Sequence, residues 1–276
     1  MILVTGAGGN VGGELVDLLA DAGRPVRALA RGPWRSRARP GVEVVAADLN
    51  RPETLSEALD GVDGVFLLGG FDDMPGVLAA MRAADVGHVV LLSSRSVVGG
   101  HADNAVAGMH MTSEAAVRAS GIGWTLLRPS GFMSNALEWR AQLRAGDVVR
   151  APFAGVPVAA IDPHDIAAVA AAVLTRADHH HRDYALTGPE SGLPADRVRI
   201  LAEVLGRPLR FEPQSDARAR AEMSETVPAR YVDAFFRFFV GGEFDDSQVL
   251  PTVQEITGRP ARSFEQWALA HAEAFK

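Results

Sequence analysis

The chain has 276 residues, of which 47% are hydrophobic, so it is long enough to bury a core and fold without covalent cross-links. It contains no cysteine, which excludes disulfides, thiolate nucleophiles and cysteine-ligated metals, and which is typical of a reducing compartment. The net charge of -7 argues against a general nucleic-acid surface, and no apolar run approaches the roughly 18 residues of a membrane helix.

Met1 leads directly into the first predicted strand and leaves no room for a signal peptide. We therefore expect a cytoplasmic protein with neither a membrane nor a nucleic-acid partner. Among the 27 lysines and arginines, Lys276 is the only lysine. This excludes Schiff-base and P-loop lysines and a Tyr-Lys catalytic pair, unless the terminal residue folds back into a site.

A glycine-rich turn at residues 5–12 follows a short apolar strand, 2–4, and precedes a helix with apolar residues at helical spacing. Strand, glycine turn and helix in this order are typical of a dinucleotide-binding unit, in which backbone N–H groups at the helix start bind phosphate. The predicted cofactor-binding residues of the turn are Gly6, Gly8, Gly9, Asn10, Val11 and Gly12.

The second predicted strand, 25–30, ends at Arg31, where a Rossmann unit meets the adenosine ribose. A carboxylate there is typical of NAD binding, whereas a guanidinium suits the 2′-phosphate of NADP(H). Arg35, Arg37 and Arg39 follow in a loop that adds positive potential. NADP(H) is therefore the predicted cofactor, with a solvated arginine loop as the alternative.

The next two predicted strands, 42–46 and 62–68, end at further candidate cofactor contacts. Asp48, with Leu49 beside it, is expected either to accept from the adenine amino group or to cap the helix that begins near residue 52. Leu68 and Gly69 lie where backbone approaches the cofactor, although a plain turn also explains the glycine.

The fifth and sixth predicted strands, 88–94 and 124–128, complete an alternation of strands and helices that predicts an α/β fold, a Rossmann-type doubly wound parallel sheet. Ligands bind at the carboxyl ends of such strands, so Ser93 and Ser94 are cofactor candidates, unless they only terminate the strand.

Beyond residue 130 strands and helices no longer alternate regularly, which predicts a smaller C-terminal α+β lobe. We expect an NADP(H)-binding domain at 1–154 and a mainly substrate-binding lobe at 155–276, with the strand at 183–187 able to return to the main sheet. The predicted substrate-binding residues lie just past the last strand and at the lobe boundary; they are Phe132, Met133, Asn135 and Phe153. Packing between lobes is the alternative.

The sequence patterns of two later segments are less specific. Residues 231–240 form a helix that is apolar nearly all round, which indicates a core helix, a cover for a substrate pocket or a subunit contact in a homodimer. Three consecutive histidines at 179–181 cannot converge on one ion, so we expect a solvated loop and no metal site.

Six segments together, 5–12, 28–31, 91–94, 125–135, 161–169 and 184–189, resemble the NmrA-like branch of the atypical short-chain dehydrogenases. The resemblance spans most of the chain. It implies NADP(H) binding in either of two settings. Some members are NADPH-dependent quinone, azo-dye or triphenylmethane-dye reductases, and others are dinucleotide-binding redox sensors without known turnover.

The Tyr-x-x-x-Lys pair of ordinary short-chain dehydrogenases is absent, since neither Tyr184 nor Tyr231 has a lysine four residues on. At the matching helix positions stand His110 and Glu114, one turn apart. A similar His-x-x-x-Glu occurs in the dye and quinone reductases of the family. The resemblance implies that His110 donates a proton or hydrogen bond and Glu114 orients it. The alternative is a surface pair without catalytic meaning.

Two functions follow from these observations. The first is an NADP(H)-dependent oxidoreductase that transfers hydride to a quinone-like or conjugated aromatic small molecule, because such an acceptor delocalises the arriving charge and needs no strong acid. The second is a non-catalytic NADP(H)-binding redox sensor or regulator, for which the missing acid is of no consequence.

Overall fold

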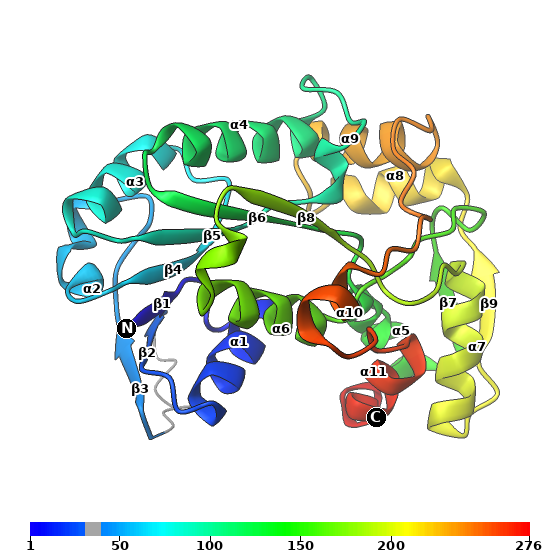
Figure 1. Ribbon diagram of the computed structural model, residues 1–276. Helices are drawn as coiled ribbons and strands as arrows, with labels where there is room; N and C mark the ends of the chain where they lie inside the picture. The colour runs from blue at the N-terminus through cyan, green and yellow to red at the C-terminus, as the bar shows by residue number, and fades with distance from the viewer. Residues whose placement is uncertain (31–39) are drawn as a thin grey trace.

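A computed structural model describes residues 1–30 and 40–276, and the predicted cofactor contact Arg31 lies outside the described residues, as do Arg35, Arg37 and Arg39. A parallel sheet of seven strands forms the centre of the molecule, in the order β3-β2-β1-β4-β5-β6-β8 (Figure 1). Its strands are β1 (Ile2–Val4), β2 (Val26–Leu29), β3 (Val42–Val45), β4 (Gly64–Leu68), β5 (His88–Leu92), β6 (Gly123–Pro129) and β8 (Arg182–Leu186). The predicted α/β, doubly wound fold is confirmed.

Helices cover both faces of this sheet (Figure 1). On one face pack α1 (Asn10–Asp21), α6 (Pro163–Leu174) and α10 (Thr252–Thr257); on the other pack α2 (Ser56–Leu59), α3 (Met74–Ala83) and α4 (Ala105–Ala119). Successive strand residues point to opposite faces, so β1 sends Ile2 and Val4 to the α1 side and Leu3 to the α3 side. Burial on both faces explains why these strands are continuously apolar.

A second core forms where the chain leaves the sheet, around Trp139, Trp267 and Phe275. It contains a two-stranded parallel sheet of β7 (Val148–Ala151) and β9 (Arg210–Pro213). Its helices are α5 (Arg140–Ala145), α7 (Pro194–Leu205) and α11 (Phe264–Ala270), with α8 (Asp216–Ser224) and α9 (Ala229–Phe239) beside it. Short 3-10 helices are η2 (Pro52–Thr54), η3 (Arg95–Val97), η4 (Met133–Trp139), η5 (Ala177–His179) and η6 (Ala272–Phe275).

The chain crosses between the two cores more than once. Elements η4 and β7 precede residue 154 and contribute to the second core. Helix α6 and strand β8 follow residue 154, but α6 packs on the main sheet and β8 is one of its strands. The expected boundary at residue 154 therefore does not divide the chain between the two cores. Sequence patterns indicate where helices and strands lie along the chain. Which of the two cores a helix or strand joins depends on which buried faces pack together.

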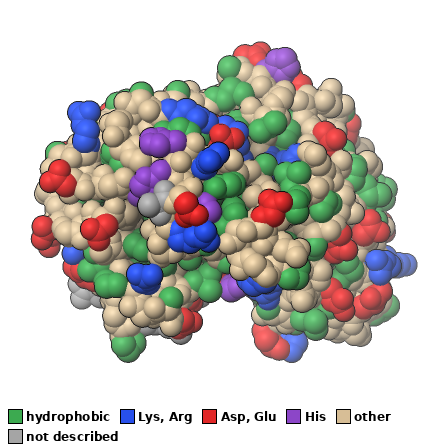
Figure 2. Space-filling view, viewed as in Figure 1, with side chains coloured by type: hydrophobic (Ala, Val, Ile, Leu, Met, Phe, Trp, Pro, Cys, Tyr) green, Lys and Arg blue, Asp and Glu red, His purple; other side chains and the backbone are tan. Residues whose placement is uncertain are grey.

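The expectation of a solvated loop at 179–181 is wrong for His179 and His180, whereas His181 is exposed. His179 is only 7% exposed, and its Nδ1 lies 2.8 Å from the Tyr184 hydroxyl. The ring of His180 packs 4.1 Å from the ring of His88, which is buried at the start of β5. Histidine side chains gather on the face shown in Figure 2, where acidic and basic groups are otherwise interspersed. Within the described residues, no three His, Asp or Glu side chains are arranged to hold a metal ion.

Helix α9 is strongly one-sided, so the expectation of an apolar surface nearly all round is also wrong. Val232, Phe236 and Phe238 are buried, whereas Arg230 and Asp233 are exposed. The apolar side of this helix faces the carboxyl ends of the main strands, which is where a ligand binds in this fold. None of the helices in the described ranges is long and apolar enough to cross a membrane.

The glycine turn depends on one very close backbone approach. A Cβ placed on Gly12 would lie 2.3 Å from the Gly6 carbonyl oxygen, which is backbone and cannot move aside easily. Gly6 itself has φ +62°, a conformation that favours glycine, and the Gly9 N–H donates to the Gly6 carbonyl at 2.8 Å. The turn therefore requires glycine at position 12 to bring α1 against β1.

We predict that Gly12→Ala lowers the free energy of unfolding by about 1–3 kcal/mol, because the added methyl group overpacks this contact. Gly155→Ala is the control, since a Cβ there meets no atom within 4 Å and φ is not positive. Urea denaturation of both variants measures the difference. Equal stability of the two variants would show that the turn relaxes without cost.

Candidate functional site

Three adjoining cavities lie at the carboxyl ends of the main strands. The turn cavity, of about 340 Å³, lies against the glycine turn and the ends of β2 and β4. The central cavity, of about 460 Å³, extends from the ends of β4, β5 and β6 to α9. The side cavity, of about 190 Å³, continues from the central cavity toward α7. Leu68 borders both the turn cavity and the central cavity, so the two are neighbours.

The turn cavity fits the adenosine and phosphate part of a dinucleotide. Gly6, Gly8 and Gly9 border it, and no side chain caps the first turn of α1 behind them. The backbone N–H groups at the start of that helix are therefore free of side-chain acceptors and can bind phosphate oxygens. The residues that line the rest of the cavity are Leu29, Ala30, Ala47, Asp48, Leu49, Leu68 and Phe71.

Three predicted cofactor residues of the turn are outside the lining of the cavity and make packing contacts, and contact of their backbone N–H groups with phosphate stays a prediction. Val11 is 4% exposed, Gly12 packs on Gly6, and neither borders the cavity. Asn10 donates from Nδ2 to the Ser134 hydroxyl at 3.1 Å, which ties the turn to η4. Asp48 borders the cavity but caps no helix, because its Oδ1 accepts from the N–H of residue 50 at 3.0 Å.

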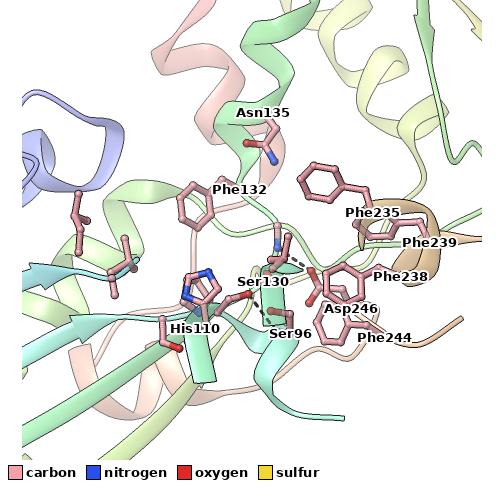
Figure 3. Close-up of a pocket in the computed structure, with 18 residues that line it drawn as sticks. Ser96, His110, Ser130, Phe132, Asn135, Phe235, Phe238, Phe239, Phe244 and Asp246 are labelled. Atoms are coloured by element: carbon pink, nitrogen blue, oxygen red, sulfur yellow. Dashed lines mark hydrogen bonds between the residues drawn. The ribbon is translucent and has the colours of Figure 1, made fainter. Parts of the chain in front are cut away.

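The central cavity has an apolar wall with a few polar groups, as Figure 3 shows. His110 and Phe132 lie on one side, and phenylalanines from α9 and the following segment lie on the other. Its lining is Leu68, Gly69, Leu92, Ser93, Ser94, Ser96, Val106, His110, Pro129, Ser130, Gly131, Phe132, Asn135, Phe235, Phe238, Phe239, Phe244 and Asp246. This is the arrangement typical of a site for an apolar or aromatic small molecule.

The predicted substrate contacts separate into two groups. Phe132 and Asn135 border both the central and the side cavity. Met133 is 2% exposed in the second core and borders neither. Phe153 borders only the side cavity and packs edge-on against Phe236, with ring centroids 5.2 Å apart. Phe132, Asn135 and Phe153 therefore lie where a substrate in these two cavities could contact them, whereas Met133 does not.

His110 borders the central cavity from α4, and its Nδ1 is buried without a hydrogen-bond partner among the described residues. Burial lowers the pKa of His110 to about 4, and the nearby Glu114 carboxylate offsets only part of this effect. The ring is therefore neutral near pH 7, with one nitrogen that donates and one that accepts. A bound carbonyl group would satisfy the donor.

Glu114 does not orient His110. Its Oε1 accepts from the Ser93 hydroxyl at 2.7 Å and from Arg128 Nε at 2.8 Å, and its Oε2 accepts from Arg128 Nη2 at 2.7 Å. Burial alone would raise the pKa of Glu114, but the hydrogen bonds from Arg128 and Ser93 outweigh it and lower that pKa. Arg128 also pairs with Asp183 near the start of β8, so Glu114 and Arg128 together tie α4 to the carboxyl ends of β5 and β6 and to β8.

Sequence reasoning missed Asp246, which reaches both the central and the side cavity from the segment after α9. Its Oδ2 accepts from Gly131 N–H at 2.8 Å, and its Oδ1 lies 3.3 Å from Arg95 Nε without an aligned hydrogen bond. Burial raises the pKa of Asp246 to about 6. The surrounding sequence has neither a motif nor a periodic pattern, so no signal pointed to this residue.

Comparison with known proteins identifies the family. A family model described as NAD(P)H-binding matches residues 6–177. A (4-alkanoyl-5-oxo-2,5-dihydrofuran-3-yl)methyl phosphate reductase of Streptomyces griseus is 46% identical, over 100% of this chain and 99% of the relative. An NAD(P)H azoreductase of Xenophilus azovorans is 35% identical, with the same coverage of both chains.

A solved structure agrees with these relatives. The NADPH complex of an NADPH-dependent quinone oxidoreductase from Escherichia coli is 25% identical and superposes with a TM-score of 0.80, over 99% of this chain and 100% of the other. The chain therefore belongs to the NAD(P)H-binding, NmrA-like family of atypical short-chain dehydrogenases, and it is an NAD(P)H-dependent reductase of that family.

Proposed function

We propose that this chain uses NADPH to reduce a small molecule whose double bond is conjugated with a carbonyl group. The central cavity carries this proposal, because it places a neutral histidine with an unpartnered ring nitrogen inside an apolar wall beside the turn cavity. Arg31, which follows the second strand in the sequence, supports NADP(H) over NAD(H) because a guanidinium suits a 2′-phosphate.

A conjugated acceptor suits a site without a strong acid. Tyr184 and Tyr231 do not border the central cavity, and the Tyr184 hydroxyl is bonded to His179. Bound NADPH supplies a hydride. When hydride reaches the far carbon of a conjugated double bond, the electron pair of that bond moves onto the carbonyl oxygen as an enolate. His110 N–H donates a hydrogen bond to that oxygen, which stabilises the developing charge. A proton from water completes the reduction.

The first acceptor class that we propose is an alkanoyl butenolide. In the substrate that the Streptomyces griseus relative is named for, the ring double bond is conjugated with both the ring carbonyl and the alkanoyl carbonyl. Hydride addition gives an enolate spread over two oxygens, which needs no strong proton donor. The phenylalanine wall of the cavity suits an alkanoyl chain. Quinones are the second class, because they delocalise the charge in the same way.

Purified protein mixed with NADPH and either acceptor is expected to oxidise NADPH, as followed by the loss of its absorbance. The alkanoyl butenolide phosphate is expected to react with a higher kcat/KM than a naphthoquinone. NADPH binding without oxidation by any acceptor in either class would contradict the proposal and favour the redox-sensor alternative, particularly if NADPH and NADP+ then bound with different affinities.

The variant His110→Ala is expected to lower kcat with the butenolide by roughly 100-fold, since it removes the donor at the developing enolate. His110→Gln retains an N–H donor and should recover part of the rate. His101→Ala, an exposed histidine just before the same helix, is the matched control. An unchanged kcat in His110→Ala would show that this ring does not contact the reacting carbonyl.

The ring of His110 should titrate with a midpoint near pH 4, as NMR of the folded protein can measure. Because this pKa lies below the unfolded value near 6.5, the unfolded state binds the proton more readily. The contribution of His110 to stability is therefore complete above about pH 6.5 and is lost as the pH falls toward 4. A midpoint near 6.5 would mean that the ring is solvated.

A further inference from the structure

Arg197 stands out as a cation without a carboxylate partner. It lies in the first turn of α7 and is partly buried. Its Nη2 donates to the carbonyl oxygens of Val158 at 3.0 Å and Gly192 at 3.2 Å. These bonds fix the guanidinium in place, and the Nε and Nη1 groups have no acceptor among the described residues.

The other arginines of the described chain that are not exposed all have a carboxylate oxygen within 4 Å. They are Arg27, Arg95, Arg128, Arg207, Arg237, Arg259 and Arg262. Asp246 is the carboxylate whose charge acts on Arg197 most strongly, but it already accepts from Gly131 N–H and pairs with Arg95. Burial lowers the pKa of Arg197, which shows that removing this cation from water is costly.

The position of Arg197 connects it to the proposed reaction. It is the basic residue among those that border the side cavity, and this cavity shares Phe132, Asn135 and Asp246 with the central cavity. In the butenolide, the phosphate is attached through one carbon to the ring carbon that receives hydride. A group that binds this phosphate must therefore lie in space that adjoins the central cavity, as the side cavity does.

We propose that Arg197 binds the phosphate monoester of the acceptor and so determines specificity for a phosphorylated over an unphosphorylated substrate. A guanidinium donates charge-assisted hydrogen bonds to phosphate oxygens, and Arg197 keeps its Nε and Nη1 groups for such bonds because the two carbonyl oxygens accept only from Nη2. Two carboxyl groups, those of Glu138 and Asp246, also border the side cavity, and burial raises the pKa of both. Asp246 is in addition paired with Arg95. This proposal rests on the butenolide function proposed above.

The test compares an alkanoyl butenolide methyl phosphate with its dephosphorylated alcohol, each with NADPH. Arg197→Gln is expected to raise KM for the phosphate by roughly 10- to 100-fold, the loss expected for hydrogen bonds to a charged group, and to leave KM for the alcohol little changed. Arg197→Lys should recover part of the loss. Arg199→Gln is the matched control, because Arg199 lies on the same helix, is exposed and pairs with Glu203. An equal change for both substrates, or no change, would overturn the proposal.

A second measurement separates this proposal from the proposed function. Phenyl phosphate is titrated by calorimetry into protein saturated with NADPH, so that the glycine turn is already occupied. Binding to the wild-type protein that is lost in Arg197→Gln supports the phosphate site, even if neither butenolide is reduced. Absence of binding to the wild-type protein, or equal binding to Arg197→Gln, would overturn the phosphate site whatever the reductase assays show.

Discussion

The contact between Gly12 and the Gly6 carbonyl determines where the rest of the site can form. Because backbone packs directly on backbone there, α1 begins immediately after β1 and its uncapped N-terminus faces the turn cavity. Asn10 then reaches across to Ser134, which joins this turn to η4, the element that contributes Asn135 to the central cavity wall. A side chain at position 12 would separate the strand from the helix and move the phosphate-binding edge away from the cavity that holds His110.

Burial keeps His110 neutral, and the neighbouring carboxylate does not reverse this effect. Glu114 is fully engaged with Ser93 and Arg128, and it therefore stabilises the junction of α4 with the sheet instead of activating His110. The histidine is held in an apolar environment where protonation is unfavourable. Such a ring is a hydrogen-bond donor and not a strong acid, which suits acceptors that delocalise charge and would serve a simple ketone poorly.

The sequence predicted the parallel sheet, the glycine turn and the strand ends that form the cavities, because these depend on local apolar runs and on glycine. It did not predict which side chains would meet. The spacing of His110 and Glu114 is that of an interacting pair on one helix face, yet Arg128, from a strand, takes the carboxylate. Met133 lies in the motif beside Phe132 but turns into the second core. Asp246 and Arg197 come from a coil segment and a helix start, and only tertiary packing brings them to the cavities.

The central claim is that hydride passes from NADPH to a carbon conjugated with a carbonyl group in this cavity. The most direct measurement uses NADPH in which both hydrogens at C4 of the nicotinamide are deuterium, with an alkanoyl butenolide methyl phosphate as acceptor and mass spectrometry and NMR of the product. The account predicts one deuterium in the reduced ring, on the carbon that bears the phosphooxymethyl group. Reduced product without deuterium at that carbon would contradict it.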